Sequence, residues 1–486
     1  METSTEAPAW VRSAIWACGI AGAFGLRIFV ATHRVGMFDA DEGVTGLMAR
    51  HVLEGEIPTF FWDQNYGGSL EAILTAGWFA IAGSSVLALR LVPLAFFVGA
   101  AYLIYRAGLL LGGKTGAIAS GSIFLTWSGW LVWKSMKAHG YYGVLAITSA
   151  AVILLVLQLR RDRDWWRYLL LGVAIGVGWW STPQIVLVAI PAVFWLVSTT
   201  KPWRQIPVII GGAIVGAAPW LAWNARHGWV SLVDQPAHPA TSYFDRLSGY
   251  WTDVLPTGLS LRIPFDGSWL ITARFGLVVY GLFLAAFVWF CWRVIRRREA
   301  RRSSLLVLIV VAYPFLYAIS GFTWFTSEPR YLVPLLLVVS LIIGTAAARS
   351  PVTLTGVLVG LIFLSAAQLS VLDTRNVYAG DVAGKPLPVD ISLLLEKLED
   401  AGVQHVLANY WLAYRISFES DERIIATSTT HVRYPPHDAI VRSDPAAAYV
   451  FVRGASDETD FLSTTFQQGA FQEIDVGELV IYQPVL

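Results

Sequence analysis

The sequence predicts a polytopic α-helical membrane protein that ends in a small C-terminal α/β domain. Hydrophobic residues make up 56% of the 486 residues and charged residues only 14%, whereas a globular chain is about 25% charged. Long apolar runs fill the first three-quarters of the chain, and the last quarter is acidic, with 17 Asp and Glu against 8 Lys and Arg from Asp373 onward. This composition excludes a disordered chain and a coiled coil, and the net charge of +1 excludes a nucleic-acid-binding protein.

Eleven apolar runs are candidates for membrane spans, which take about 20 residues each; the fifth and sixth of them are short and could be divided differently. They are Trp10–Ala31, Val86–Tyr105, Gly116–Trp133, Tyr142–Leu159, Trp166–Trp180, Gln184–Val197, Ile206–Leu221, Trp269–Trp292, Leu305–Gly321, Tyr331–Ala347 and Val352–Val371. One more run, Ser69–Ala82, has only about 14 residues, which favours an interfacial or re-entrant helix. Met1–Pro8 lacks the basic segment of a cleavable signal peptide, so we expect the first run to remain as an anchor.

Basic clusters give the orientation, because Lys and Arg collect in cytoplasmic loops. They lie at Arg106 and Lys114, Arg160–Arg163, Lys201 and Arg204, and Arg296–Arg302. One orientation places all four inside, and it places the first loop (32–85), the middle loop (224–268) and the tail outside. If Ser69–Ala82 spanned the membrane, the first loop would face inward instead. We expect a multi-pass plasma-membrane protein with a membrane domain (1–371) and an extracytoplasmic domain (372–486).

The tail has the alternating pattern of a small α/β domain. An amphipathic helix is predicted at Ile391–Ala401, and further helices at Trp411–Phe418 and Glu458–Gln468. Short strands are predicted at Val403–Asn409, Arg423–Thr427 and Ala448–Val452, and a closing hairpin at Phe471–Gln483.

The first outer loop holds the strongest chemical signal. Seven acidic residues lie between Asp39 and Glu71, and Asp41 and Glu42 open an amphipathic helix. Carboxylates at a helix start complement its dipole, so these acids could serve the helix alone. Acids beside an apolar surface also act as general bases, metal ligands or sugar anchors. A partly desolvated carboxylate is more basic than one in water, which suits proton abstraction from a hydroxyl.

Three further outer segments carry polar side chains that suit a carbohydrate or a phosphate. Phe60–Glu71 combines aromatic rings with amides, although an interfacial aromatic belt would look similar. Lys134–Tyr142 adds basic and phenolic groups between two spans. Arg330 precedes a late span, and its guanidinium fork suits a lipid phosphate. The candidates for sugar or acceptor binding are Asp39, Asp63, Gln64, Asn65, Tyr66, Glu71, Tyr141, Tyr142 and Glu328; those for phosphate binding are Arg330, Lys137, His139 and Tyr331, with Arg27 and Arg90 as weaker ones.

Several common motifs are missing. There is no Gly-rich phosphate loop, no HExxH, no GxSxG and no CxxC pair, and Cys18 and Cys291 sit in apolar runs without metal-ligand spacing. Nucleotide chemistry on the cytoplasmic side is therefore not expected. An activated donor used outside would be a lipid-linked one.

At these positions the sequence resembles the GT-C superfamily of membrane glycosyltransferases. It is most similar to the bacterial branch related to protein O-mannosyltransferases (glycosyltransferase family 39) and to the aminoarabinose transferase of lipid A. The motifs cover most of the chain. They are Asp41-Glu42, Met48-Ala-Arg-His-Val-Leu-Glu-Gly55, Tyr66-Gly-Gly-Ser-Leu-Glu71, Leu87-Ala-Leu-Arg-Leu-Val-Pro93, Glu328-Pro-Arg-Tyr-Leu-Val-Pro334 and Asn409-Tyr-Trp-Leu-Ala-Tyr-Arg-Ile-Ser-Phe-Glu-Ser420.

The resemblance implies a GT-C fold with about 11 transmembrane helices and interfacial helices in the first outer loop. It also implies transfer of a sugar from a polyprenyl phosphate to an acceptor hydroxyl at the outer face, with inversion. Asp41, with Glu42 beside it, matches the general base, and Arg330 matches a donor-phosphate ligand. The aminoarabinose transferases have a Lys in the stretch matching Tyr66–Glu71, and this chain has none. Their donor specificity is therefore not carried over.

We predict a polyprenyl-phosphate-sugar-dependent glycosyltransferase, hexosyl or pentosyl, that acts on a glycan, lipid or protein acceptor. No obligatory cofactor is expected, although the Asp39-Ala-Asp41 arrangement leaves a divalent metal open. The alternative is a polytopic lipid or sugar transporter or flippase, which predicts broken spans with ionisable groups near the midplane. The acids gather at one face instead, and this favours the enzyme. A non-catalytic scaffold would leave the first-loop cluster unexplained.

Overall fold

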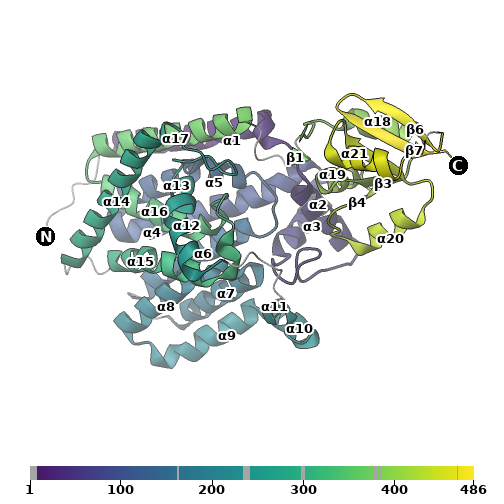
Figure 1. The fold of residues 1–486 in the computed structure, drawn as a ribbon. Coiled ribbons are helices and arrows are strands. Elements are labelled where there is room, and N and C mark those ends of the chain that lie inside the picture. Colours follow the sequence, from purple (N-terminus) through teal and green to yellow (C-terminus); the bar gives the residue numbers. More distant parts are fainter. Residues whose placement is uncertain are drawn as a thin grey trace.

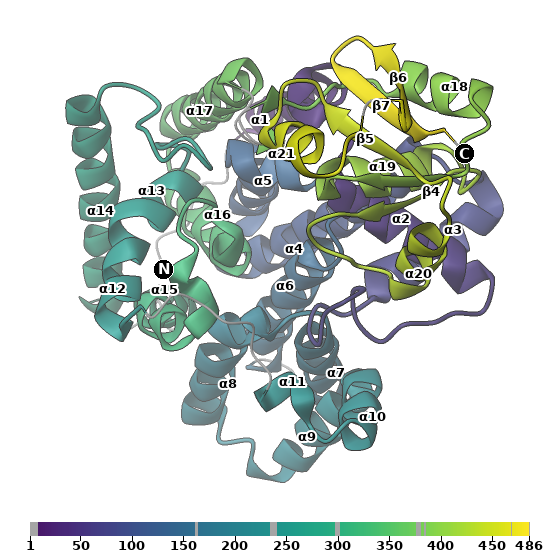
Figure 2. The ribbon, with the colours of Figure 1, turned by 45° about the vertical axis from the view of Figure 1, so that its right-hand side comes forward.

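A computed structural model gives the architecture of the chain (Figure 1). It describes residues 8–160, 164–233, 241–296, 302–375, 381–382, 385–467 and 469–485. Parts of two predicted basic clusters, residues 161–163 and 297–301, lie outside the described residues. Within the described residues, a large helical bundle carries a small mixed domain at one end, beside helices α2 and α3 (Figures 1 and 2).

The bundle is built from the predicted apolar runs. Its long helices are α1 (Ala9–Thr32), α4 (Val86–Thr126), α6 (Tyr142–Leu159), α7 (Trp165–Ser181), α8 (Val186–Thr200), α9 (Ile206–Gly216), α10 (Ala218–Arg226), α14 (Ala273–Arg296), α15 (Ser303–Ile319), α16 (Val333–Ala347) and α17 (Pro351–Arg375). Among the described residues, seven helices are long and apolar enough to cross a membrane, or eight if the bent α9–α10 pair is one span. The chain is a multi-pass membrane protein.

Helix α4 contains two predicted runs rather than one. Its helical dihedral angles fail at Gly112 and Gly113, and Gly113 adopts a φ of 65°, a left-handed conformation that favours glycine. The two arms then pack against each other so closely that a Cβ on Gly108 would lie 2.7 Å from the Cα of Ala117. Every predicted run therefore falls mainly on helical segments, but two of them cross a break: Gly116–Trp133 continues past the end of α4 into α5 (Gly129–Lys134), and Ile206–Leu221 crosses the bend between α9 and α10. Eleven crossings remain a prediction.

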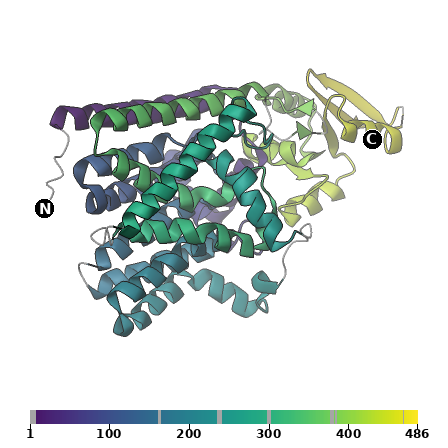
Figure 3. The same cartoon turned by 60° about the vertical axis from the view of Figure 1, so that its left-hand side comes forward.

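Helices α1 and α17 run side by side along one edge (Figures 1 and 3). Helix α14 crosses the outside of the bundle and is mostly exposed. Only 6% of its most apolar 18-residue stretch is buried within the protein. Such an apolar surface suits contact with lipid.

The first loop (32–85) forms two short helices at the end of the bundle. A 3₁₀ turn, η1 (Arg34–Gly36), leads to α2 (Ala40–Leu53), and α3 (Leu70–Ala82) follows. Helix α3 has 13 residues, a length of about 20 Å at 1.5 Å per residue, which is less than the roughly 30 Å of a bilayer core. Helix α3 is therefore too short to span, in agreement with the predicted interfacial helix.

Short elements connect the long helices. They are α5 (Gly129–Lys134), η2 (Pro183–Ile185), η3 (Trp203–Gln205), α11 (Val230–Val233), α12 (Tyr243–Gly249), the π-helix η4 (Tyr250–Val254), α13 (Leu255–Gly258), η5 (Gly321–Trp324) and η6 (Arg330–Leu332). Helix α5 and the turns around η5 and η6 approach the same end of the bundle as α2, and this places their polar residues near the first loop.

The C-terminal domain is a mixed five-stranded sheet with helices. The sheet order is β4-β3-β5-β7-β6, with β3 parallel to β4 and β5, and with β7 antiparallel to β5 and β6. The strands are β3 (His405–Ala408), β4 (Ile425–Ser428), β5 (Ala448–Val452), β6 (Phe471–Val476) and β7 (Leu479–Pro484), and the helices are α18 (Ser392–Asp400), α19 (Tyr410–Glu419), α20 (Pro435–Ser443) and α21 (Ser456–Thr464). A small ribbon of β1 (Asp381–Val382) and β2 (Lys385–Pro386) precedes the domain.

The predicted strands, helices and hairpin of the tail all match observed elements, whereas α20 and the β1–β2 ribbon had no predicted counterpart. The domain docks through α19 onto α2, and glycines allow the close approach. A Cβ on Gly43 would lie 2.6 Å from the carbonyl oxygen of Tyr414, and one on Gly46 would lie 2.3 Å from the ring of Phe418. The first loop and the C-terminal domain thus form one packed unit.

Candidate active site

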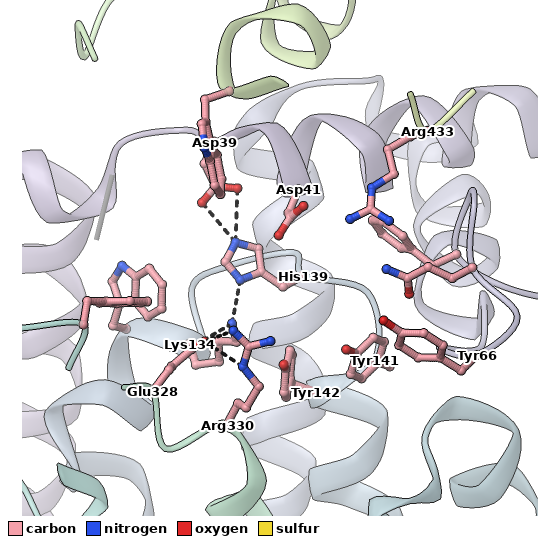
Figure 4. Close-up of a pocket in the computed structure, with 15 residues that line it drawn as sticks. Asp39, Asp41, Tyr66, Lys134, His139, Tyr141, Tyr142, Glu328, Arg330 and Arg433 are labelled. Atoms are coloured by element: carbon pink, nitrogen blue, oxygen red, sulfur yellow. Dashed lines mark hydrogen bonds and ion pairs between the residues drawn. The ribbon is translucent and has the colours of Figure 1, made fainter. Parts of the chain in front are cut away.

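A polar pocket of about 250 Å³ lies where the first loop, the α5–α6 connection, the turn before α16 and the C-terminal domain meet. Figure 4 shows the side chains that face it. The lining residues are Asp39, Asp41, Phe61, Gln64, Tyr66, Trp133, Lys134, His139, Tyr141, Tyr142, Phe265, Glu328, Arg330, Trp411 and Arg433. Segments far apart in the sequence therefore supply one cavity that contains both carboxylates and cations.

The start of α2 brings two carboxylates to the pocket. Asp39 is the N-cap, because its carboxylate accepts a hydrogen bond of 3.1 Å from the backbone N–H of Glu42. Asp41 lies in the first turn and points into the cavity (Figure 4). Its carboxylate accepts a hydrogen bond from the hydroxyl of Tyr410, a residue of the C-terminal domain. The helix dipole stabilises both negative charges at this end.

Glu42, the neighbour of Asp41, does not line the pocket. Its side chain is fully buried, and Arg90 holds it by two hydrogen bonds of 2.8 and 2.7 Å. Lys137 donates a third, of 2.8 Å. Burial alone would raise the pKa of Glu42, but the charges of Arg90 and Lys137 outweigh it and lower the pKa. Arg90 and Lys137 are thereby engaged beneath the pocket rather than facing a ligand.

Alternating charges connect Asp39 to the far side of the pocket. Asp39 lies 3.0 Å from Lys137 and 3.0 Å from the Nε2 of His139. The Nδ1 of His139 lies 2.8 Å from the Nζ of Lys134. Lys134 in turn lies 3.2 Å from Glu328. This chain of contacts fixes the orientation of the His139 ring between an anion and an ammonium group.

The buried carboxylates of this chain stay ionised. Burial acts to raise the pKa of Asp39, but His139 and Lys137 lower it well below its usual range. Burial likewise acts to raise the pKa of Glu328, yet Lys134 and Arg330 bring it down to about 2. Each negative charge is therefore matched by a neighbouring cation at neutral pH.

Arg330 occupies a junction between two cavities. Its guanidinium lies 2.8 Å from Glu328 and 4.2 Å from the ring centroid of Phe325. Arg330 lines the polar pocket and also a second cavity of about 240 Å³, whose walls include Val186, Leu187, Leu316 and Ile319. The guanidinium of Arg330 thus lies at the boundary between a polar pocket and a largely apolar cavity.

Tyrosines form the wall beside Arg330. Tyr66 and Tyr141 line both cavities, and Tyr142 lines the polar one. Burial raises the pKa of Tyr141 to about 12, so its hydroxyl stays protonated and can donate a hydrogen bond. Figure 4 shows Tyr66, Tyr141 and Tyr142 along the same side as Arg330.

Other predicted site residues lie outside the polar pocket. Asp63 is in the exposed part of the first loop, 3.4 Å from His431. Asn65 lines a separate cavity with Trp179, Trp180 and Trp220. Glu71 is buried and accepts a hydrogen bond of 3.3 Å from the backbone N–H of Gly140.

Two of the phosphate candidates, Tyr331 and Arg27, are also outside the polar pocket. Tyr331 lines the apolar cavity, and its hydroxyl donates a 2.7 Å hydrogen bond to the carbonyl oxygen of Phe322. Arg27 donates 2.9 Å to the carbonyl oxygen of Leu125.

Sequence reasoning missed the contribution of the C-terminal domain. Arg433, just before α20, lines the pocket, and its Nε donates a 3.2 Å hydrogen bond to the hydroxyl of Tyr410. Its guanidinium also lies 5.5 Å from the ring centroid of Phe61. Tyr410 belongs to the segment Asn409–Ser420, which resembles the family, and this resemblance could have suggested Tyr410 as a site residue. No sequence signal points to Arg433.

Comparisons with known proteins were made with the sequence and with the structure. No protein-family model matches the sequence, and no curated protein sequence matches it. The structure is similar to ArnT from Cupriavidus metallidurans bound to undecaprenyl phosphate, with a TM-score of 0.67 and 12% identity over 96% of this chain and 97% of that chain. The apo state of the same protein gives a TM-score of 0.65 and 13% identity, with the same coverage.

The archaeal oligosaccharyltransferase AglB from Archaeoglobus fulgidus, in complex with an inhibitory peptide and a dolichol-phosphate, has a lower TM-score of 0.48 at 11% identity, over 98% of this chain and 75% of that one. The likeness to ArnT covers nearly the whole of both chains. The chain therefore has the fold of ArnT, in agreement with the fold that the sequence resemblance predicted.

Proposed function

We propose that this protein is a glycosyltransferase that moves a sugar from a polyprenyl phosphate to an acceptor hydroxyl, with Asp41 as general base. The observation that carries the proposal is the position of Arg330 between the polar pocket of Asp41 and an apolar cavity. A polyprenyl-phosphate sugar has the same order of parts: sugar, phosphate, lipid. The sugar would occupy the polar pocket, the phosphate would meet Arg330, and the first isoprene units would enter the apolar cavity.

The reaction is a single displacement. The acceptor oxygen attacks the anomeric carbon, Asp41 takes the hydroxyl proton, and the bond from the anomeric carbon to the phosphate oxygen breaks. Polyprenyl phosphate leaves with the bonding electrons, so negative charge develops beside Arg330. Attack opposite the leaving group inverts the anomeric configuration. A positioned base commonly contributes about 10²–10⁴-fold to such a step, and preorganised charges near the leaving group contribute comparably.

The remaining charged groups fit supporting roles. Lys134 is buried beside Glu328 and faces the pocket, where it adds a second positive charge near the proposed phosphate position. His139 contacts both Lys134 and Asp39, and it thereby fixes the position of Lys134 relative to the start of α2. Arg433 and Tyr410 bring the C-terminal domain into contact with Asp41 and the proposed acceptor side.

A similar fold in ArnT bound to undecaprenyl phosphate supports a lipid-phosphate donor here. We also propose that the pocket and residues 372–486 lie on the outer face of the plasma membrane. The positive-inside rule assigns the basic loops to the cytoplasm, and the pocket and the tail then lie on the opposite side. The acceptor is a glycan, lipid or protein hydroxyl.

One observation favours the alternative of a lipid or sugar transporter. Helices α9 and α10 bend by 67° at a break, and transporters use broken spans. The residues at this break, Gly216 to Ala218, are uncharged, however, and the charged groups gather at the pocket beside α2. The enzyme therefore accounts for more of the charged residues than the transporter does.

The test is a donor screen with the purified protein. Several polyprenyl-phosphate sugars would be incubated with acceptor candidates, and products would be identified by mass. We expect turnover with at least one donor, and Arg330→Ala should raise its KM by about 10–100-fold, since a charge-assisted hydrogen bond contributes about 1.5–3 kcal/mol. Arg226→Ala, in α10, is the matched control and should leave KM unchanged. Movement of intact donor across vesicles without any product would favour the transporter, and an unchanged KM for Arg330→Ala would remove the phosphate role.

A further inference from the structure

At the other end of α2 from Asp41, two histidines and a glutamate come together. His51 comes from the last turn of α2, Glu422 from the turn after α19, and His437 from α20. The Nε2 of His51 lies 2.9 Å from Glu422 Oε1, and the Nε2 of His437 lies 3.4 Å from the same oxygen. One ligand atom from each residue lies within 4.8 Å of the other two.

These side chains are enclosed by the docked domain. The side chains of His51, Glu422 and His437 are 10%, 20% and 8% exposed. Tyr434 packs edge-on against both imidazole rings, at centroid distances of 4.9 and 4.8 Å. The Nδ1 of His437 is buried and has no hydrogen-bond partner within the part of the chain that the structure describes. The histidines are thus held together away from water, with one imidazole nitrogen unsatisfied.

The groups around His51 are those that usually orient a metal-bound histidine. Metal-bound histidines usually donate their other ring N–H to a carboxylate, which fixes the tautomer and the orientation of the ring. The Nδ1 of His51 lies 3.0 Å from Glu56 Oε2. Glu56 is itself fixed by a 2.7 Å hydrogen bond from the hydroxyl of Tyr434. The Nε2 of His51 is therefore the nitrogen turned toward Glu422 and His437.

We propose that His51, Glu422 and His437 bind a divalent transition-metal ion, with Zn²⁺ as the best match. Two imidazole nitrogens and one carboxylate oxygen are ligands that Zn²⁺ takes in proteins, at about 2.0–2.2 Å each, with a fourth position filled by water. The ion would replace the direct contacts of both histidines with Glu422 Oε1. His51 belongs to α2 in the first loop, whereas Glu422 and His437 belong to the C-terminal domain. The ion would therefore hold the domain on α2.

This role is structural and lies outside the pocket of Asp41. None of the three ligands lines that pocket, and the ion would touch no reacting atom of the proposed transfer. The inference therefore does not depend on the proposed function. It does predict that metal binding stabilises the folded protein, because a ligand that binds only the native state raises its stability.

The experiment measures metal on the purified full-length protein. The protein would be stripped with a chelator, supplied with ZnCl₂ or MgCl₂, separated from free metal, and analysed for metal content and thermal unfolding. We expect about one zinc per chain and a rise of several degrees in the unfolding temperature with ZnCl₂ alone. His51→Ala and His437→Ala should each lower the zinc content at least tenfold. His405→Ala is the matched control, because His405 pairs with Asp444 at 2.6 Å in the same domain, with no third ligand among the residues that the structure describes.

A second measurement covers variants that fail to fold. Co²⁺ bound to the unmodified protein through imidazole and carboxylate groups gives visible absorption bands, which added Zn²⁺ should abolish. Less than about a tenth of a zinc per chain, together with no such bands, would overturn the proposal and leave an ion-paired cluster. Zinc binding that both histidine variants retain in full would overturn it as well.

Discussion

Replacement of Glu42 by Gln should damage stability, whereas replacement of Asp41 by Asn should damage turnover. The two acids are adjacent in the first turn of α2, but their surroundings differ. Glu42 has no exposed side-chain surface and is held by Arg90 and Lys137. Asp41 faces the pocket and contacts Tyr410. The two nearly isosteric substitutions therefore distinguish a carboxylate that stabilises the fold from a carboxylate that acts on the substrate.

The magnitudes follow from the contacts. Glu42→Gln removes the charge that pairs with Arg90 at 2.7 Å and with Lys137 at 2.8 Å. Loss of one partner from a buried ion pair costs about 3–5 kcal/mol. Lys137 would still be paired with Asp39 at 3.0 Å. We therefore expect a loss of stability at the lower end of this range, about 3 kcal/mol. In Asp41→Asn, the amide oxygen can still accept from Tyr410, so the stability change should stay near 1 kcal/mol, while kcat should fall by about 10²–10⁴-fold.

The assay compares thermal unfolding in detergent with single-turnover rates on the donor that the screen identifies. Asp164→Asn is the control, because this carboxylate is 49% exposed and lies just before α7, away from the pocket. Full turnover by Asp41→Asn would refute the assignment of the base. An unfolding temperature of Glu42→Gln equal to that of the wild type, combined with a turnover loss like that of Asp41→Asn, would show that Glu42 acts on the substrate and would refute its structural role.

Two further changes test Arg433 in the pocket and the buried Glu71 outside it. Arg433→Ala should raise KM for one substrate by about 10–100-fold with a smaller effect on kcat, since a charge-assisted hydrogen bond contributes about 1.5–3 kcal/mol; Arg442→Ala on the same domain, whose Arg pairs with Asp438 at 2.7 Å, is the control, and equal KM values for both variants would exclude Arg433 from the pocket. Burial raises the pKa of Glu71 from 4.5 to about 8, so the folded state favours the neutral acid, and the wild type should lose up to about 1.4 kcal/mol of stability for each pH unit as the pH rises through this window. Glu71→Gln should match the wild type near pH 5 and be more stable near pH 9, and parallel stability curves for the two proteins would contradict the buried neutral acid.

Sequence patterns predicted the helices and the tail domain well because both depend on local properties. A run of apolar residues must form a helix in a membrane, since the backbone polar groups can be satisfied only within the segment. In the tail, short apolar runs separated by turn residues produced the observed order of strands and helices. The short run Ser69–Ala82 was also predicted correctly, because its length alone decides whether it can span.

The site was harder to predict because its contacts are not local. Asp41 and Glu42 are equivalent in the sequence pattern. Only the position of Arg90, 48 residues further along, shows that Glu42 is paired. Likewise Tyr410 reaches Asp41 across 369 residues. A polar residue in a loop says nothing by itself about which cavity it faces, and Arg433 is one such residue.

The C-terminal domain is a part of the site rather than an appendage to it. Helix α2 presents Asp41 at its first turn and packs along Gly43 and Gly46 against α19, which carries Tyr410. Any displacement of the domain would therefore remove the hydrogen bond to Asp41 and withdraw Arg433 from the pocket at the same time. The bundle alone would keep the proposed phosphate ligand Arg330 but lose one wall of the pocket. Docking of the domain onto α2 is thus a condition for a complete pocket, and interactions far from the reacting atoms can control the activity through it.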